Sequence, residues 1–330
     1  MRLINSSTKA ILQDAGTDTV NTLVGIYKQI ELAGRTCYKS EDKITPTSAK
    51  EFVDRMINSK HYAMLEHGTV YLIVPINDTT KTHIDDYLSN SYSVVNFIYS
   101  YDSDISDYTN KAYITTNYRV LIEHGWLADL QYISQPTIHH EYRLTIKFIC
   151  DRGVSHEFVR HRVFSFAQES TRWCDYTKTK FSNELTYIIP SWCTLSEGKY
   201  KWISFKVCNF DCWGGWQKDS ESTETDQNSE LGKIIVKRMT DYHWLLYGLE
   251  SAERNYKSLI SLSDWKPQQA RAVLPNALKT ELVMTGTVSQ WLDFLKLRLS
   301  TNAHPDAYKL AKEVKQIIDN KEWKNTLLNA

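Results

Sequence analysis

A basic triplet near the middle of the chain places the strongest constraint on the fold. Arg160, His161 and Arg162 are adjacent, and Ser170 follows after seven residues. Three neighbouring side chains that carry or can carry positive charge are costly to bury together. The simpler interpretation is a solvated basic turn. The alternative is a site for an anion, because planar guanidinium groups fork onto phosphate or carbonyl oxygens.

The segment before the triplet has the pattern of a strand. Between residues 142 and 148, apolar side chains alternate with polar ones. A period of two residues predicts a half-buried strand, which is more often part of an antiparallel sheet. The strand-like run ends at Cys150, a turn is expected at residues 151–153, and a short amphipathic stretch follows. The triplet is therefore expected just beyond the end of a strand.

Apolar residues at helical spacing indicate several helices. They are predicted over residues 18–33, from Ser48 onward, over residues 230–250, around residues 291–299 and over residues 302–320. Gly34 is a natural stop for the first helix. Ser48 and Glu51 form a capping-box pattern at the start of the second, and Pro305 lies near the first turn of the last.

A β-rich apolar run from His67 to Pro75 predicts a buried strand. Helices outnumber strands, and the two kinds of element do not alternate regularly. The sequence therefore predicts an α+β fold and not a doubly wound sheet.

Two stretches, residues 77–141 and 206–229, have the composition of insertions. The first is polar and rich in tyrosine. The second combines Gly214 and Gly215 with many hydroxyl and acidic residues, which is typical of a mobile surface loop. Neither has the composition of a linker. We therefore predict a single domain over residues 1–330 that carries these two insertions.

The composition restricts the partners and the compartment. Lys+Arg and Asp+Glu both number 39, so no overall positive field attracts nucleic acid, and an anionic ligand would need a local arginine cluster. The sequence shows no charged-then-apolar leader and no apolar run of the roughly 20 residues that a membrane helix needs, so we expect no membrane insertion. The six cysteines are scattered, which predicts reduced thiols in a cytoplasmic protein. Cys208 and Cys212 have no convincing second pair, so no metal site is expected.

The segment from Arg160 to Arg172 resembles the defining motif of the flavin-dependent thymidylate synthases, the ThyX family. Four other stretches resemble the same family, namely residues 33–37, 65–69, 270–275 and 294–298. The matched blocks occur in the family's order and cover residues 1–76, 142–205 and 230–320. The two uncovered stretches are the expected insertions.

This resemblance implies a ThyX-like fold with mixed helices around a mainly antiparallel sheet. It implies an enzyme that converts dUMP to dTMP, with methylene-tetrahydrofolate as carbon donor and NADPH-reduced FAD as hydride source. It further implies a homotetramer with active sites at the subunit interfaces.

The resemblance also implies roles for individual residues. Arg298 is the expected catalytic residue, because a guanidinium beside the uracil stabilises charge that develops during the reaction. The expected FAD contacts are Thr69, Arg160, His161, Arg162, Gln168, Thr287 and Asp293. The expected dUMP contacts are Glu157, Arg160, Gln168, Glu169, Ser170, Thr171, Arg172, Arg271 and Arg298.

Several positions depart from the family's pattern. Glu157 stands where the family often has Gln, and Gln168 stands where it often has Glu. Thr287 and Asp293 stand where family members often have a flavin-contacting Asn. The roles of these four residues are less firmly implied than those of the arginines.

Two other functions stay open at this point. A non-catalytic nucleotide- or RNA-binding protein would use the arginines for phosphate and the tyrosines for stacking. A different flavoenzyme on the same scaffold would not depend on dUMP. A flavin spectrum with NADPH oxidation separates the first function from the enzyme, and dUMP dependence separates the second.

The place of Ser170 at the end of the motif also invites a role as covalent nucleophile. The candidate base, His161, lies nine residues earlier. We expect it to be a weak base because Arg160 and Arg162 disfavour its protonated form. An anion-binding turn is the favoured interpretation.

Overall fold

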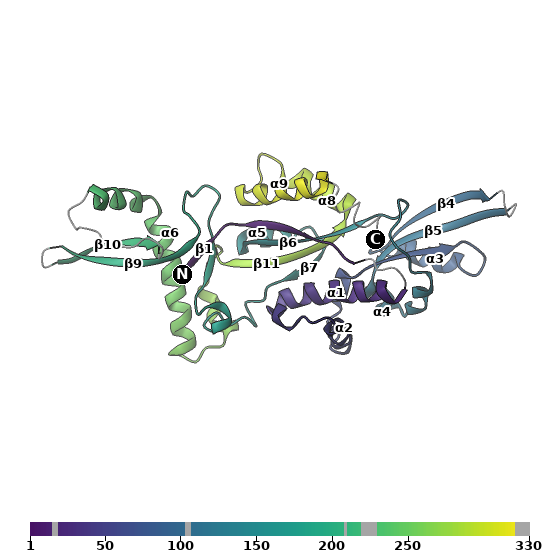
Figure 1. Ribbon diagram of the computed structural model, residues 1–330, viewed down its shortest axis with the longest axis horizontal. Coiled ribbons are helices and arrows are strands. Elements are labelled where there is room, and N and C mark those ends of the chain that lie inside the picture. The colour runs from purple at the N-terminus through teal and green to yellow at the C-terminus, as the bar shows by residue number, and fades with distance from the viewer. Residues whose placement is uncertain (15–18, 103–106, 208–209, 219–229, 321–330) are drawn as a thin grey trace. The chain divides into compact units, whose positions relative to one another are not determined.

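In the computed structural model, the structure describes residues 1–14, 19–102, 107–207, 210–218 and 230–320 (Figure 1). The chain divides into two compact units whose segments alternate in the sequence. Unit 1 comprises Met1–Ser7, Ile149–His156 and Ser170–Thr280; unit 2 comprises Thr8–Phe148, Glu157–Glu169 and the chain from Glu281 on. The elements include both helices and antiparallel strand pairs, which confirms the α+β class. The single domain with two insertions stays a prediction.

The main sheet of unit 2 has the strand order β2-β6-β11-β7. Its strands are β2 (Ser7–Ile11), β6 (Arg143–Asp151), β11 (Lys279–Thr287) and β7 (Ser165–Gln168). Strand β7 pairs antiparallel with β11, with Gln168 opposite Leu282 and Ser165 opposite Thr285. Almost every residue of β11 is buried, as expected for a strand covered on both faces.

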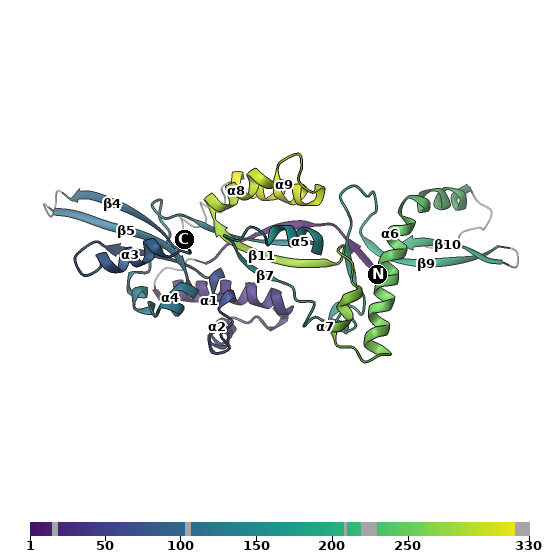
Figure 2. The same cartoon turned by 180° about the vertical axis from the view of Figure 1, so that it is seen from behind.

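Helices cover both faces of this sheet (Figures 1 and 2). In both views α8 (Val288–Arg298) and α9 (Pro305–Asn320) lie on one side, and α1 (Thr19–Tyr38) and α2 (Ser48–Asn58) lie on the other. The indole of Trp291 in α8 donates a hydrogen bond to the carbonyl of Leu144 in β6 at 3.1 Å. These helices and β6 confirm the elements predicted from periodicity, and α9 begins at Pro305 as expected.

The predicted end of the first helix is wrong. Helix α1 continues through Gly34 to Tyr38. A Cβ atom at position 34 would lie 2.4 Å from the Phe52 ring of α2, so the glycine permits close helix packing and does not stop the helix. The capping box is also absent. Ser48 is the first residue of α2, and its hydroxyl donates to the Glu31 carboxylate at 2.9 Å.

The turn expected after β6 is absent too, because α5 (Arg152–Phe158) begins directly at the end of the strand. The Asp151 carboxylate accepts the backbone N–H of Val154 at 2.9 Å, which stabilises the start of a helix. The basic triplet therefore follows a short helix.

A second sheet of unit 2 is an antiparallel meander with the order β3-β5-β4. It contains β3 (Thr69–Pro75), β4 (Val94–Asp102) and β5 (Asp107–Asn117), and it packs with α3 (Lys81–Ser89), α4 (Tyr118–His124) and the 3-10 helices η2 (Tyr62–His67) and η3 (Leu127–Tyr132). Strand β3 confirms the predicted buried strand. Much of the stretch 77–141 belongs to this structure, and Ile84, Ile114 and Leu121 lie in its core.

Unit 1 is built on a sheet with the order β10-β9-β1-β8. Its elements are β1 (Arg2–Ile4), β8 (Thr186–Ile188), β9 (Gly198–Val207), β10 (Phe210–Lys218), α6 (Glu230–Ser261), α7 (Pro267–Ala270) and the 3-10 helix η5 (Arg271–Val273). Strand β10 lies within residues 206–229, the stretch that we expected to be a mobile loop, and pairs antiparallel with β9, most of which precedes that stretch. The rest of the loop prediction lies outside the described residues. None of the described helices is long and apolar enough to span a bilayer.

Candidate active site

Three of the predicted residues meet in unit 2, at the end of α5 and the end of α8. The Arg298 guanidinium donates to the Glu157 carboxylate at 2.5 Å and to the Glu157 carbonyl oxygen at 2.7 Å. Its Nε–H group donates to Nε2 of His161 at 3.0 Å. All three nitrogens of the guanidinium therefore have an acceptor, so its plane is held in one orientation.

His161 is neutral in this arrangement. Its Nε2 atom accepts a hydrogen bond, so the proton lies on Nδ1. Burial, followed by the charge of Arg298, lowers the pKa of His161 to about 4. The expectation of a weak base is confirmed, but the cause is different, because Arg160 and Arg162 are both exposed to solvent. The imidazole packs against the ring of Phe294 with centroids 4.9 Å apart.

Arg160 and Arg162 lie in the turn after α5. Among the residues that the structure describes, neither guanidinium has a hydrogen-bond or ion-pair partner. Charged groups that are exposed and unpaired are available to an anionic ligand. The triplet thus places two free cations beside one neutral, partly buried imidazole.

The predicted residues at the end of β7 and directly after it are more enclosed. Gln168 is half-buried at the end of the strand, and Glu169 is only 2 % exposed. The backbone N–H of Glu169 donates to the carbonyl of Glu281 at 2.8 Å. Burial, followed by the charge of Glu169, raises the pKa of Cys37 to about 11. In this structure the Glu169 side chain is therefore part of the interior of unit 2.

Four predicted residues of unit 1 form a second group. Arg271 Nη1 donates to the hydroxyl of Thr171 at 3.4 Å, although the two residues are 100 positions apart. Arg172 Nε donates to the side-chain oxygen of Gln268 at 3.2 Å. Both arginines are exposed, so two cations from separate segments share one surface. Such a pair suits a phosphate group.

Ser170 takes part in the turn of this group. Its hydroxyl accepts the backbone N–H of Arg172 at 3.3 Å. Among the described residues of unit 1, no histidine or carboxylate contacts this hydroxyl. The geometry is that of a turn rich in backbone N–H groups, as predicted, and lacks the base that a serine nucleophile needs.

Thr287 and Asp293 have other partners. The hydroxyl of Thr287 accepts the backbone N–H of Gln290 at 3.2 Å, so it caps the N-terminus of α8. The Asp293 carboxylate is exposed and pairs with Lys296 at 2.7 Å. The sequence pattern did not predict that Thr287 caps a helix.

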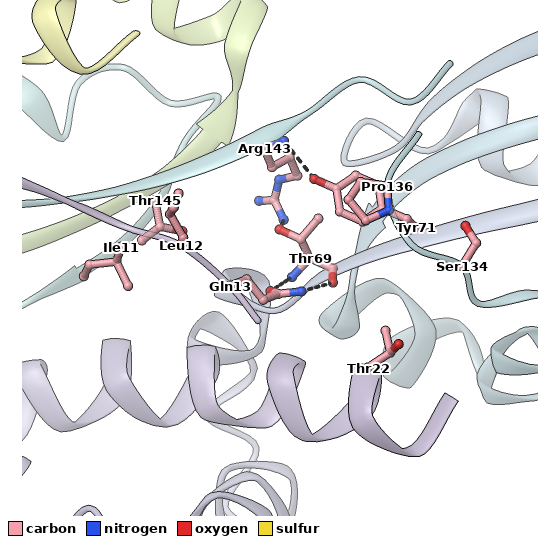
Figure 3. Close-up of a pocket in the computed structure, with 10 residues that line it drawn as sticks. All are labelled: Ile11, Leu12, Gln13, Thr22, Thr69, Tyr71, Ser134, Pro136, Arg143 and Thr145. Atoms are coloured by element: carbon pink, nitrogen blue, oxygen red, sulfur yellow. Dashed lines mark hydrogen bonds between the residues drawn. The ribbon is translucent and has the colours of Figure 1, made fainter. Parts of the chain in front are cut away.

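Thr69 lines a pocket in unit 2 (Figure 3). Gln13 brackets its backbone, donating to the Thr69 carbonyl and accepting its N–H, both at 2.8 Å. The Arg143 guanidinium also lines the pocket and approaches the Thr69 hydroxyl at 3.4 Å. Arg143 was not among the residues predicted from the sequence, because a polar position in an alternating strand indicates exposure and not a pocket.

His67 lies next to this region and is fully buried. Its Nδ1 atom is 2.8 Å from the hydroxyl of Thr285 in β11. Burial, followed by the charge of Arg143, lowers the pKa of His67 to about 3. This histidine is therefore neutral and links η2 to the main sheet.

Comparison with known proteins places the chain in a family. The family model described as Thy1, thymidylate synthase complementing protein, matches residues 100–321. A flavin-dependent thymidylate synthase of Corynebacterium efficiens is 28% identical over 199 residues, which cover 59% of this chain and 60% of the relative. Another of Mycobacterium avium is 28% identical over 167 residues, which cover 49% of this chain and 51% of the relative.

The similarity also extends beyond this region in one relative. A flavin-dependent thymidylate synthase of Mycolicibacterium vanbaalenii is 22% identical over 294 residues, which cover 88% of this chain and 74% of the relative. With the first two relatives, the matched part spans only about half to 60% of their length. Since the family model covers most of the chain, including both arginine groups, this protein belongs to the Thy1 family of thymidylate synthase complementing proteins.

Proposed function

We propose that the protein is a cytoplasmic flavin-dependent thymidylate synthase. It converts dUMP to dTMP, with methylene-tetrahydrofolate as carbon donor and NADPH-reduced FAD as hydride source. Membership of the Thy1 family and the names of the relatives support this proposal. The structural observation that carries it is the fixed Arg298 guanidinium beside a neutral His161, with the unpaired Arg160 and Arg162 on the same turn.

The described residues fit an anionic flavin. FAD supplies the redox chemistry when it is bound, and the protein supplies binding, orientation and charge. Arg160 and Arg162 are the best supported contacts, because both are exposed and have no partner among the described residues. His161, Gln168, Thr69 and Asp293 are further proposed contacts. Thr287 is the least supported, because its hydroxyl already caps α8.

The proposed roles toward dUMP divide between two kinds of chemistry. Arg172 and Arg271, with Ser170 and Thr171, are suited to the phosphate, because the arginines are exposed cations and the turn offers backbone N–H groups. Arg298 is suited to the pyrimidine. Its fixed guanidinium would stabilise negative charge that develops on the ring oxygen during the reaction.

Glu157 is proposed to act on the pyrimidine through Arg298, and Gln168 and Glu169 are the remaining proposed dUMP residues. Glu169 is buried here, so its role would require the β7 end to open. A homotetramer with active sites at subunit interfaces belongs to the same proposal. Light scattering that shows a fully active monomer would overturn that assembly.

The experiment that tests the function is a flavin titration with purified protein. We expect the protein to take up FAD and to show the absorbance of oxidised flavin. We also expect NADPH to bleach this absorbance without oxygen. A colourless protein that does not bind added FAD would contradict the proposal and favour a nucleotide-binding role for the arginines.

A further inference from the structure

Arg143 differs from the other enclosed cations of unit 2 in its partners. Arg35 pairs with Glu31 at 2.9 Å, Arg119 with Glu66 at 2.5 Å and Lys147 with Glu281 at 2.5 Å. Among the described residues, Arg143 has no carboxylate within ion-pairing distance. A half-buried guanidinium that has no counter-ion is an attractive partner for an anion.

The hydrogen bonds of Arg143 are to neutral oxygens and are long. Its Nη1 atom donates to the carbonyl of Glu66 at 3.1 Å and to the Thr69 hydroxyl at 3.4 Å. Its Nη2 atom donates to the Ser165 hydroxyl at 3.3 Å. Charge-assisted bonds to an oxyanion are shorter than these, about 2.7–2.9 Å, so the site has more donor capacity than its present partners use.

Ser134 lines the same pocket and has a second unused polar group (Figure 3). Its hydroxyl is buried and has no hydrogen-bond partner among the described residues. Its backbone N–H donates to the carbonyl of Tyr71 at 2.9 Å, so the residue is fixed against β3. A buried hydroxyl without a partner is unfavourable, and a ligand oxygen in the pocket would satisfy it.

The remaining walls of the pocket are held in place. The Tyr71 hydroxyl accepts the backbone N–H of Arg143 at 3.2 Å, and Gln13 brackets Thr69. The lining also contains the apolar side chains of Ile11, Leu12 and Pro136. Arg143 and Ser134 lie at opposite ends of this lining (Figure 3), so the pocket combines two separate donor positions with an apolar wall, a composition typical of a binding site.

We infer that this pocket binds an oxyanion group, either phosphate or carboxylate, with Arg143 and the Ser134 hydroxyl as donors. The inference rests on the proposed function for its two candidate sources, the diphosphate of FAD and the glutamate carboxylates of the folate. It also gives the stretch 77–141 a role, because this stretch supplies Ser134 and Pro136 to the pocket wall.

Ser134→Ala is the variant that separates binding from folding. Removal of an unpaired buried hydroxyl should leave the melting temperature of the ligand-free protein unchanged or raise it. The same change should weaken binding of the oxyanion ligand about tenfold, since a hydrogen bond to a charged group is lost. Ser93→Ala is the matched control, because the Ser93 hydroxyl bonds to Thr116 at 2.8 Å and lies outside the pocket. It should lower the melting temperature slightly and leave the affinities unchanged.

Paired ligands identify the source of the oxyanion. Dissociation constants should be measured for FAD and for riboflavin, which lacks phosphate. They should also be measured for tetrahydrofolate and for tetrahydropterin, which lacks the glutamate. Ser134→Ala and Arg143→Lys should both weaken the binding of one charged ligand, FAD or tetrahydrofolate, and leave the binding of its counterpart without the oxyanion unaffected. Arg143→Lys should have this effect because lysine does not reproduce the planar fork of arginine.

Two results overturn different conclusions. If the wild type binds FAD but both variants bind all four ligands as the Ser93→Ala control does, the inferred oxyanion site is wrong and the proposed function stands. If the wild type does not bind FAD, the proposed function fails. In that case calorimetric titration with inorganic phosphate still tests the pocket. Arg143→Lys should lose the heat of phosphate binding that Ser93→Ala retains. Equal heats of binding in the two variants would show that the inferred oxyanion site is wrong.

Discussion

Arg298 is bound to Glu157 through both its carboxylate and its backbone carbonyl, although the two residues are 141 positions apart. The carboxylate balances the positive charge of the guanidinium, and the carbonyl fixes the direction of the Nη2 atom. The proposed catalytic arginine is therefore oriented by the end of α5, which also leads into the basic triplet. Glu157 is a positioning residue in this account.

Glu157→Gln should keep the orientation of Arg298, because the amide oxygen still accepts a hydrogen bond. Glu157→Ala should lower kcat by about tenfold or more, since a hydrogen bond between charged groups is lost. Steady-state kinetics of dTMP formation should show the loss mainly in kcat, with the alanine variant still folded by circular dichroism. Equal activity of Glu157→Ala and the wild type would show that the orientation of Arg298 does not depend on this residue.

The neutral state of His161 predicts a pH dependence of stability. Its folded pKa of about 4 lies below the ordinary value of 6.5. The unfolded chain therefore binds more protons than the folded protein between about pH 6.5 and pH 4. The stabilisation should be complete above this window and should decrease as the pH falls through it.

The test is the melting temperature between pH 7.5 and pH 4.5 for the wild type and for His161→Asn. The Asn side chain accepts a hydrogen bond from Arg298 but does not titrate, so the variant should lose less stability on acidification. His67 and His140, with pKa values of about 3 and about 4, act in the same direction and remain in both proteins. Identical pH profiles would contradict the assignment of a lowered pKa to His161.

Ser170 should not act as a covalent nucleophile. Its hydroxyl accepts a backbone N–H and, among the described residues of unit 1, has no base beside it. Ser170→Ala should weaken dUMP binding and retain measurable dTMP formation. Mass spectrometry of the wild type trapped with a 5-fluoro analogue of dUMP should find no adduct on this residue. An adduct there, with complete loss of turnover in the variant, would require a different mechanism.

Gly34 and Gly248 form a matched pair for a stability test. A Cβ atom at Gly34 would lie 2.4 Å from the Phe52 ring, whereas a Cβ atom at Gly248 in α6 would have no neighbour within 4 Å. Gly34→Ala should destabilise the protein by about 1–3 kcal/mol through overpacking. Gly248→Ala should stabilise it by about 0.5–1 kcal/mol, because alanine favours a helix. Denaturant unfolding measures both values, and a stabilised Gly34→Ala variant would contradict the close packing of α1 and α2.

Periodicity predicted those elements whose burial follows one face. It located β6, α2, α8 and α9, because their apolar residues repeat with the period of the element. Strand β3 was located by its continuous apolar run, because it is buried on both faces. It failed at Gly34, where the absence of a side chain serves a tertiary contact that no local pattern reveals. It also failed at residues 151–153, where a carboxylate at the end of β6 starts a helix directly.

The sequence predicted which residues belong to the candidate site, but it did not predict the contacts between them. The resemblance identified the arginines, but the bond between Arg298 and His161 joins residues 137 positions apart. The neutral state of His161 follows from that bond and from burial, which the sequence does not show. Arg143 was missed for the same reason, since its alternating position in β6 carries no information about the pocket beside Thr69.

The central claim is that the Arg298 guanidinium acts on charge that develops on dUMP during flavin-dependent thymidylate synthesis. The most direct measurement is dTMP formation by wild type and Arg298→Lys with FAD, NADPH, methylene-tetrahydrofolate and dUMP. We predict that the wild type forms dTMP only when all four are present. We also predict that Arg298→Lys keeps its fold but loses roughly tenfold or more in turnover, because lysine lacks the bidentate fork. Absence of dTMP with the wild type, or normal turnover with Arg298→Lys, would contradict the account.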